Sequence, residues 1–334
     1  MLHGWIILDK PVGLGSTQAV GAIKRIFREA GEPKTKIGHG GTLDPLANGV
    51  LPIALGEATK LCGRMLDATK GYDFTISFGE ETDTLDAEGE TVATSDVRPT
   101  LDQVEAILSR FTGVIEQVPP AYSALKIGGK SAYARTRAGE EVELKPRLAT
   151  VHSLTLLPAG EASGEGDHGA KRHGGGVGAK PLHHSTSSSG PPPQPSAREE
   201  RDEITLSATV SKGTYIRSLA RDIAHALGTV GHISYLKRTR AGPFSLAQAI
   251  SLDFLEEAAK ARRLTETVLP LTAALDDIPA LPVTPDQARL LRHGQMLFGF
   301  PAKPGLRMAM LEETPVALVE ATADGLKVVR GFNL

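Results

Sequence analysis

Apolar and polar residues along the chain follow both the two-residue period of strands and the longer period of helices. Short apolar runs and alternation predict strands in six segments, 5–8, 50–55, 72–78, 149–157, 203–210 and 232–237. Apolar residues that recur every three or four positions predict helices in four segments, 16–31, 57–68, 101–111 and 214–227. Strands and helices interleave without a regular strand–helix–strand rhythm, so the pattern favours an α+β fold.

The first helix has well-marked expected ends. Ser16 is expected to be its N-cap, because a serine hydroxyl can accept a hydrogen bond from the free amides of the first turn. Val20, Ile23 and Phe27 would share one apolar face, and the helix is expected to stop near Gly31.

Residues 159–202 differ from the rest of the chain in composition. Gly, Ser, Pro and His dominate, and the only large aliphatic residues are Val177 and Leu182. Such a segment cannot bury enough apolar surface to offset the entropy of ordering, so we expect a disordered loop. It separates two predicted strands and is interpreted as an enlarged hairpin connection. Its histidines are irregularly spaced, which favours incidental composition over a metal site.

The C-terminal part of the chain changes character twice. Residues 251–277 are acidic and predict a helical connector. From residue 278 onward prolines interrupt the pattern, and short strands are expected at 307–311, 316–321 and 326–329. The expected organisation is therefore a main body over 1–250, the connector, and a small β-rich domain over 278–334.

Composition and cysteine content limit the possible functions. A chain of 334 residues has room for about two domains with a buried core. Cys62 is the only cysteine, which excludes an internal disulfide and a multi-cysteine zinc site and favours the cytoplasm. No apolar run has the length of a membrane span or a signal-peptide core, so no membrane partner is expected.

Basic residues are unevenly distributed on a chain of net charge −2. Residues 10–64 contain eight basic and four acidic side chains, and residues 203–242 contain six and two. These surpluses could form one positive face for a polyanion, because phosphate contacts depend on local charge. Two solvated surfaces without a ligand are the alternative that charge alone leaves open.

The densest cluster of unusual residues is 38–60, GHGGTLDPLANGVLPIALGEATK. Its glycines allow a close approach of the backbone to a ligand, and Pro45 biases Asp44 toward an extended conformation. The Asp44 carboxylate could therefore project from a rigid loop into a site. The alternative is a local turn in which this carboxylate binds only neighbouring backbone amides.

Residues 38–60 and five further blocks resemble the motifs of the tRNA pseudouridine synthase B family, in the family's order. The further blocks are DKP at 9–11, KGY at 70–72, TDTLDAEG at 82–89, PPAYSALK at 119–126 and KGTYIRSL at 212–219. Together they extend from Leu8 to about Arg238. The insertion at 159–202 departs from the family pattern, but it falls between motifs.

This resemblance implies a pseudouridine-synthase-like mixed sheet flanked by helices, with a small β-rich, PUA-like RNA-binding domain at the C-terminus. The implied reaction converts uridine 55 in the T-loop of tRNA to pseudouridine. The N1–C1′ bond breaks, the base turns, and C5 joins C1′ with no redox change, so neither a cofactor nor a metal is expected.

The same resemblance assigns three catalytic residues. Asp44 would lie beside C1′, as carboxylates do in glycoside chemistry. Arg217 would oppose the rise in pKa that burial alone would cause in such a carboxyl group. Tyr72 would stack on the uracil and help to remove the C5 proton.

The resemblance also assigns residues to substrate binding: His39, Tyr215, Leu236, Asp86 and Lys10. Tyr215 and Leu236 would contact the everted base, since extrusion of a nucleotide costs a few kcal/mol in stacking and pairing. His39 would occupy space vacated in the RNA. Asp86 would orient Arg217 or another polar group.

The implied partner is the T-arm stem-loop of tRNA, bound by a monomer. A non-catalytic module that binds RNA or folds tRNA is the alternative from another functional class. A related synthase that needs a guide RNA and protein partners is a third hypothesis.

Overall fold

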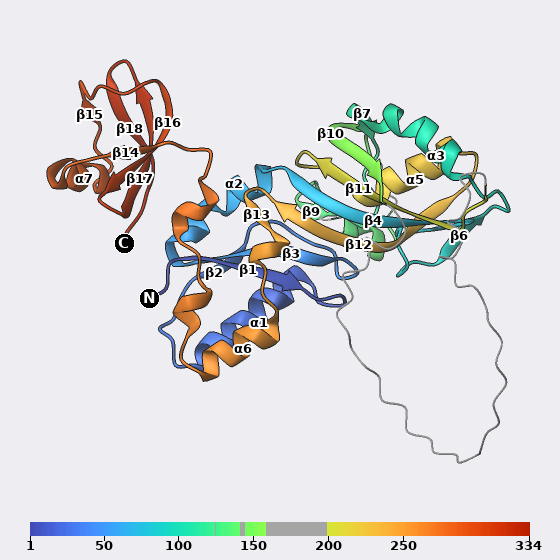
Figure 1. The fold of residues 1–334 in the computed structure, drawn as a ribbon, viewed down its shortest axis with the longest axis horizontal. Helices are drawn as coiled ribbons and strands as arrows, with labels where there is room; N and C mark the ends of the chain where they lie inside the picture. The colour runs from blue at the N-terminus through green and yellow to red at the C-terminus, as the bar shows by residue number, and fades with distance from the viewer. Residues whose placement is uncertain (124, 141–143, 158–198) are drawn as a thin grey trace, which may run out of the picture.

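The computed structural model describes residues 1–123, 125–140, 144–157 and 199–334 (Figure 1). A mixed nine-stranded sheet has the strand order β1-β3-β12-β4-β11-β10-β7, with β2 paired to β3 and β13 to β12. Its strands are β1 (Gly4–Lys10), β2 (Ile37–His39), β3 (Asn48–Leu55), β4 (Lys70–Phe78), β7 (Gly113–Gln117), β10 (Arg147–Leu156), β11 (Glu203–Val210), β12 (Gly231–Ala241) and β13 (Phe244–Ser245). The mixed sheet flanked by helices that the sequence predicted is confirmed.

Helices and small hairpins surround this sheet. The helical segments of the main body are α1 (Ser16–Glu29), η1 (Gly56–Leu61), α2 (Cys62–Asp67), α3 (Leu101–Leu108), η2 (Ser109–Phe111), α4 (Ala132–Arg137), α5 (Ile216–Ala226) and η3 (Leu246–Gln248). Two short hairpins pair β5 (Glu80–Thr82) with β6 (Thr91–Thr94), and β8 (Lys126–Ile127) with β9 (Lys130–Ser131).

Both faces of the sheet are buried where β1 and β3 pair. Along β1, Ile6 and Leu8 pack against α1 and α6 (Leu252–Lys260), whereas Trp5 and Ile7 point to the opposite core. Successive strand residues point to opposite faces, so a continuous apolar run fits a strand that is covered on both sides.

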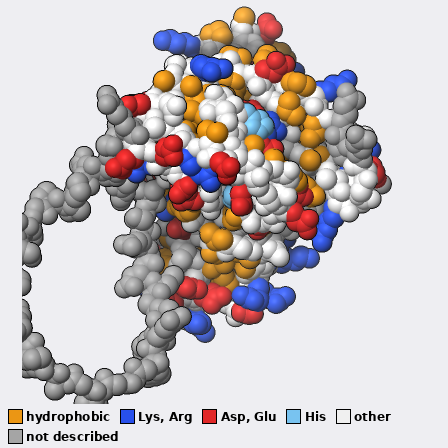
Figure 2. Space-filling model, turned by 90° about the vertical axis from the view of Figure 1, so that its right-hand side faces the viewer, with side chains coloured by type: hydrophobic (Ala, Val, Ile, Leu, Met, Phe, Trp, Pro, Cys, Tyr) orange, Lys and Arg blue, Asp and Glu red, His pale blue; other side chains and the backbone are white. Residues whose placement is uncertain are grey.

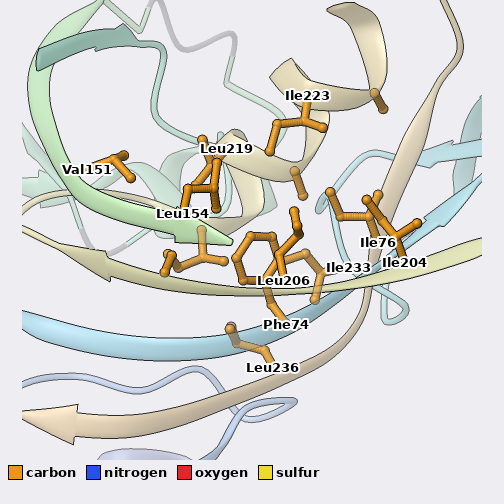
Figure 3. Packing of buried hydrophobic residues seen from close by; sticks show 14 of the residues in the cluster. Phe74, Ile76, Val151, Leu154, Ile204, Leu206, Leu219, Ile223, Ile233 and Leu236 are labelled. Carbon is orange, nitrogen blue, oxygen red and sulfur yellow. The ribbon is translucent and has the colours of Figure 1, made fainter. Parts of the chain in front are cut away.

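A second core lies at the other end of the sheet. Helices α3 and α5 cover β4, β11 and β12 there, and Phe74, Leu206 and Ile233 meet Leu219 and Ile223 of α5 (Figure 3). This packing holds the N-terminus of α5 close to the sheet.

A parallel strand pair brings two distant parts of the chain together. Of the pairings described for the nine-stranded sheet, β12 with β3 is parallel and the others are antiparallel. Lys237 lies opposite Asn48, and Arg238 lies opposite Gly49. The middle of the glycine-rich segment at 38–60 is therefore fixed beside the middle of β12.

The start of α1 differs from the prediction. Gly15 is the N-cap and Ser16 is the first helical residue. The Ser16 hydroxyl does not cap the helix, because it binds both backbone polar groups of Leu43, 27 residues away. The predicted apolar face is confirmed, since Val20, Ile23 and Phe27 are all buried.

The predicted insertion falls mostly outside the described residues. The strands on either side of it, β10 and β11, form an antiparallel pair in which Leu156 lies opposite Leu206. The segment thus joins two neighbouring antiparallel strands, as a hairpin connection does. The four histidines weighed as metal ligands also lie outside the described residues.

The C-terminal region forms a separate five-stranded sheet, at the upper left of Figure 1. Its order is β14-β16-β17-β18-β15, with β14 (Ala280–Pro282), β15 (Leu297–Phe298), β16 (Gly305–Leu311), β17 (Thr314–Thr322) and β18 (Gly325–Gly331). Helix α7 (Pro285–Arg292), which the sequence analysis missed, packs on it. Thr284 caps α7 and Pro285 occupies its first turn, a signal that was readable in the sequence.

Residues 251–277 connect the two sheets. They contain helix α6 followed by the short segments η4 (Leu264–Thr267) and η5 (Leu271–Ala274). Leu271 and Ala274 pack with Trp5 of β1 and Met308 of β16, so both sheets share this core. No helix of the described residues is long and apolar enough to cross a membrane.

Candidate active site

A cavity of about 290 Å³ opens between the glycine-rich segment, the N-terminus of α5 and the middle of the large sheet. Its polar and charged side chains include Asp44, Lys70, Ser123, Arg217 and Arg238. Tyr72, Tyr215 and Leu236 also line it. Its volume is close to the lower limit for ligand pockets, about 300 Å³.

Hydrogen bonds on both sides of Asp44 hold its backbone in place. The Ser16 hydroxyl donates to the Leu43 carbonyl oxygen at 2.9 Å and accepts from the Leu43 amide at 2.8 Å. On the other side, the Gly13 amide donates to the carbonyl oxygen of Pro45 at 2.8 Å. The Asp44 side chain is therefore presented by a backbone with little freedom.

Arg238 joins this loop to the sheet. Its guanidinium donates to the carbonyl oxygens of Val50 at 2.7 Å, Thr42 at 3.1 Å and Gly41 at 3.4 Å. The parallel pairing of β12 with β3 places the arginine where it reaches both ends of the loop. Sequence reasoning gave Arg238 no role, because nothing local indicates that its charge is buried.

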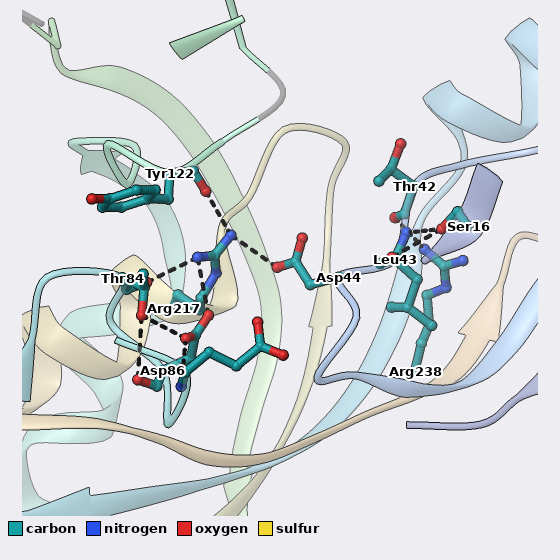
Figure 4. A network of polar contacts seen from close by, with 10 residues as sticks. Ser16, Thr42, Leu43, Asp44, Thr84, Asp86, Tyr122, Arg217 and Arg238 are labelled. Carbon is teal, nitrogen blue, oxygen red and sulfur yellow. Dashed lines mark hydrogen bonds and ion pairs between the residues drawn. The ribbon is translucent and has the colours of Figure 1, made fainter. Parts of the chain in front are cut away.

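Asp44, Arg217 and Asp86 form one charged network (Figure 4). Arg217 Nη2 lies 2.9 Å from Asp44 Oδ2, and Nη1 lies 3.1 Å from Asp86 Oδ2. The guanidinium also donates to the carbonyl oxygens of Thr84 at 2.8 Å and Tyr122 at 2.9 Å. Four acceptors thus fix the orientation of the arginine.

Exposure distinguishes the two carboxylates of this network. The side chains of Arg217 and Asp86 are 8% and 5% exposed, whereas that of Asp44 is 39% exposed. Asp86 does not line the cavity, and its Oδ1 also accepts from Thr84 Oγ1 at 2.6 Å. Asp44 is therefore the carboxylate that a ligand in the cavity can reach, held there by a buried cation.

Aromatic and aliphatic side chains form another part of the cavity. Tyr72 comes from β4 and Leu236 from β12, and Tyr215 precedes α5. Gln117 fixes Tyr215, since its side-chain amide accepts from the Tyr215 backbone amide at 2.8 Å and donates to its carbonyl oxygen at 3.1 Å. These side chains provide surface on which a planar base can stack.

His39 and Lys10 are not among the residues that line the cavity. His39 ends β2, and its Nδ1 is buried without a hydrogen-bond partner among the described residues. Burial and the nearby Arg238 charge lower the pKa of His39. Lys10 Nζ donates to the carbonyl oxygens of Leu14 at 2.6 Å, Pro11 at 2.9 Å and Pro45 at 3.3 Å. Burial lowers the pKa of Lys10 to about 8.

Lys70 is a cavity residue to which sequence reasoning gave no role. It lies two residues before Tyr72 on β4, and burial lowers its pKa to about 8. Its position in the KGY block was the available signal. Across the described ranges, no group of three or more His, Cys, Asp or Glu side chains is placed to hold a metal ion.

Two sequence models match the chain. The model described as "TruB family pseudouridylate synthase (N terminal domain)" matches residues 24–165. The model described as "tRNA pseudouridylate synthase B C-terminal domain" matches residues 217–276.

Curated relatives match over the whole length. The chain is 54% identical to the tRNA pseudouridine synthase B of Zymomonas mobilis, with 99% of this chain and 96% of the relative covered. It is 55% identical to the protein of the same name from Novosphingobium aromaticivorans, with 100% and 98% covered.

Solved structures share the fold. A chain of an H/ACA RNP bound to a substrate RNA containing 2′-deoxyuridine matches with a TM-score of 0.66 and 23% identity, over 99% of this chain and 86% of that one. A chain of a Cbf5-Nop10-Gar1 complex matches with a TM-score of 0.64 and 25% identity, over 99% and 84%.

Proposed function

The chain belongs to the TruB family of tRNA pseudouridine synthases, and on this basis we propose that it converts uridine 55 of the tRNA T-loop to pseudouridine in the cavity around Asp44. The observation that carries the proposal is the Asp44–Arg217 pair, in which a reachable carboxylate lies 2.9 Å from a buried guanidinium. Family membership favours this enzyme over the non-catalytic module considered from the sequence.

Asp44 acts on the sugar carbon C1′ or on the base while the N1–C1′ bond breaks. Its partner Arg217 stabilises the ionised carboxylate, because a guanidinium stays charged when buried. Asp86 acts on substrate only through this arginine and is a positioning residue. The order of the bond-making steps does not alter these assignments.

The target uridine must leave the T-loop stack to reach Asp44. Tyr72, Tyr215 and Leu236 receive the extruded uracil in the cavity. The Tyr72 hydroxyl assists removal of the C5 proton after C5 has joined C1′. A stacking contact is worth roughly 1–3 kcal/mol per base, which offsets much of the cost of extrusion.

Lys10 and His39 lie close to the loop that carries Asp44 and contribute outside the cavity. Lys10 holds the Pro45 carbonyl oxygen and so positions Asp44. His39 fills space on the RNA side of the loop once the nucleotide has been extruded. The C-terminal sheet at 278–334 serves as a PUA-like RNA-binding domain beside the catalytic domain at 1–250. The monomeric state and the cytoplasmic location remain predictions.

Tritium release from tRNA transcripts that contain 5-tritiated uridine tests the proposal. The purified chain alone is expected to release tritium from the T-loop uridine, which also distinguishes it from a guide-RNA-dependent synthase. Asp44→Asn keeps the size of the side chain but removes its charge, and we expect more than about a 10³-fold loss of kcat. Asp102→Asn, on the exposed first turn of α3, is the matched control and keeps full activity.

Two results would contradict the proposal. Full activity of Asp44→Asn would remove the carboxylate from the reaction. Tritium release confined to uridines outside the T-loop would overturn the proposed target while leaving the chemistry in place.

A further inference from the structure

Two cations that line the cavity, Lys70 and Arg238, form no ion pair with a carboxylate of the described residues. They are 8% and 1% exposed, respectively. None of the ion pairs within the described ranges includes either side chain. The third cation of the cavity, Arg217, is paired with two carboxylates.

Neutral backbone oxygens account for only part of their hydrogen-bonding capacity. Lys70 Nζ donates to the carbonyl oxygens of Leu66 and Ala68, both at 2.6 Å. Arg238 donates to three carbonyl oxygens. An ammonium group has three N–H donors and a guanidinium has five, so these bonds leave one donor on Lys70 and two on Arg238.

Burial of two uncompensated positive charges is unfavourable by itself. Burial and the nearby Arg238 charge lower the pKa of Lys70 to about 8, which reflects the same unfavourable arrangement in the free protein. An anion between the two side chains would relieve it. The Asp44 carboxylate at this cavity is bound to Arg217, and Asp67, whose charge partly offsets that of Lys70, is bound to Lys212 at 2.9 Å. A ligand anion would therefore add compensating charge that these two carboxylates do not supply.

We propose that Lys70 and Arg238 form an anion site for an RNA backbone phosphate that adjoins the extruded uridine. The inference rests on the proposed function, since that function places the uridine in this cavity. The ribose of an extruded nucleotide carries a phosphate on each side, and Asp44 beside C1′ would repel both. Two buried cations on the wall that carries Tyr72 lower this repulsion and orient the sugar.

The contacts of Lys70 also allow a purely structural role. Its ammonium group binds carbonyl oxygens at the C-terminus of α2, where a cation is favourable. That role alone would make RNA affinity independent of any particular phosphate charge. An experiment therefore has to vary the phosphate and the lysine together.

The test measures dissociation constants of T-arm RNA in the Asp44→Asn background, where turnover is blocked. Methylphosphonate, which is neutral, replaces the phosphate on the 5′ or the 3′ side of the target uridine. Each RNA carries 2′-deoxyribose before the altered linkage and is compared with the same RNA with an ordinary phosphate. Each RNA is measured with three proteins, in which residue 70 is Lys, Met or Arg. Thermal unfolding reports the stability of each protein.

We expect one of the two methylphosphonates to weaken binding about tenfold when Lys70 is present, and less than twofold in Lys70→Met. Lys70→Met is expected to weaken binding of ordinary RNA about tenfold and to reduce the slope of log Kd against log salt by about 0.7. Lys70→Arg keeps the charge and is expected to retain most of the affinity. Lys260→Met, an exposed lysine on α6, controls for the loss of one charge and keeps the slope.

The proposal is overturned if neither methylphosphonate weakens binding when Lys70 is present, a result that needs no folded Lys70 variant. It is equally overturned if the methylphosphonates cost the same in Lys70→Met. Neither result affects the role of Asp44, because tritium release by the wild-type protein and its loss in Asp44→Asn are measured separately.

Discussion

Replacement of Arg217 by Met is expected to separate the structural and catalytic roles of its two carboxylate partners. The substitution keeps much of the apolar volume of the side chain but removes the charge. Asp86, whose side chain is 5% exposed, then loses its buried cationic partner. Removal of one partner from a buried ion pair costs about 3–5 kcal/mol, so Arg217→Met is expected to lose this much unfolding free energy.

A second substitution, Asp86→Asn, is expected to restore most of that stability. Oδ1 of residue 86 accepts hydrogen bonds from Thr84 Oγ1 at 2.6 Å and from the Glu88 amide at 3.1 Å, and an asparagine oxygen can accept both. The double variant contains no unpaired buried charge at this position. We expect it to lie within about 1–2 kcal/mol of the wild-type protein in unfolding free energy.

Activity is expected to remain lost in the double variant. Asp44 has its ion pair with Arg217, and the uncharged methionine side chain cannot replace that contact. Urea unfolding followed by the fluorescence of Trp5, the only tryptophan and a fully buried one, measures stability. Tritium release measures activity. Recovery of both stability and activity in the double variant would refute the reasoning, because Arg217 would then matter only as the partner of Asp86.

Three further predictions concern the loop that carries Asp44 and the buried Lys70. Ser16→Ala leaves both backbone polar groups of Leu43 without their buried partner. We therefore expect a lower kcat and a loss of about 1–3 kcal/mol in the unfolding free energy measured with urea. An unchanged unfolding midpoint would contradict the positioning role of Ser16. Gly49→Ala would place a Cβ against the Arg238 carbonyl oxygen at a φ of +96°, so we expect urea unfolding to show a loss of at least about 2 kcal/mol in unfolding free energy. Gly63→Ala, in α2 with open space at the added Cβ, is the control and is expected to leave stability unchanged or to raise it by up to about 1 kcal/mol. The pKa of Lys70 is about 8 in the folded protein and ordinarily 10.5, so between these pH values the unfolded chain binds more protons than the folded one. This lysine should therefore make the unfolding free energy rise with pH across that interval. Urea unfolding at several pH values should show a smaller rise for Lys70→Met.

The main secondary structure was readable because each element carries its own local pattern. The alternation at 72–78 reflects a strand with two different faces, and Val20, Ile23 and Phe27 recur at the period of a helix. Helix α7 was missed although its cap was readable, whereas the start of α1 was misplaced because a side chain binds a distant part of the chain. Ser16 has the residue type of an N-cap, but its hydroxyl is used by Leu43.

The candidate residues of the site were recognised from motifs, and several of them meet in the structure. Asp44, Tyr72, Arg217, Tyr215 and Leu236 line one cavity, and Asp86 lies directly behind Arg217. Motif resemblance could propose these residues, because a motif preserves residue types at fixed spacing. It did not distinguish Lys10 and His39, which lie outside the cavity lining, from the residues that line it.

By itself, the sequence determined most of the main strands and helices, that Asp44 lies in a constrained loop, and which family the motifs resemble. The tertiary structure alone decided that Arg217 joins two carboxylates from different loops, and that Lys70 and Arg238 are buried together at the same cavity. The physical reason is that the hydrophobic period and the turn chemistry of a segment depend on a few neighbouring residues. The burial and pairing of a charge depend instead on distant segments that strand pairing brings together, as the pairing of β3 with β12 does here.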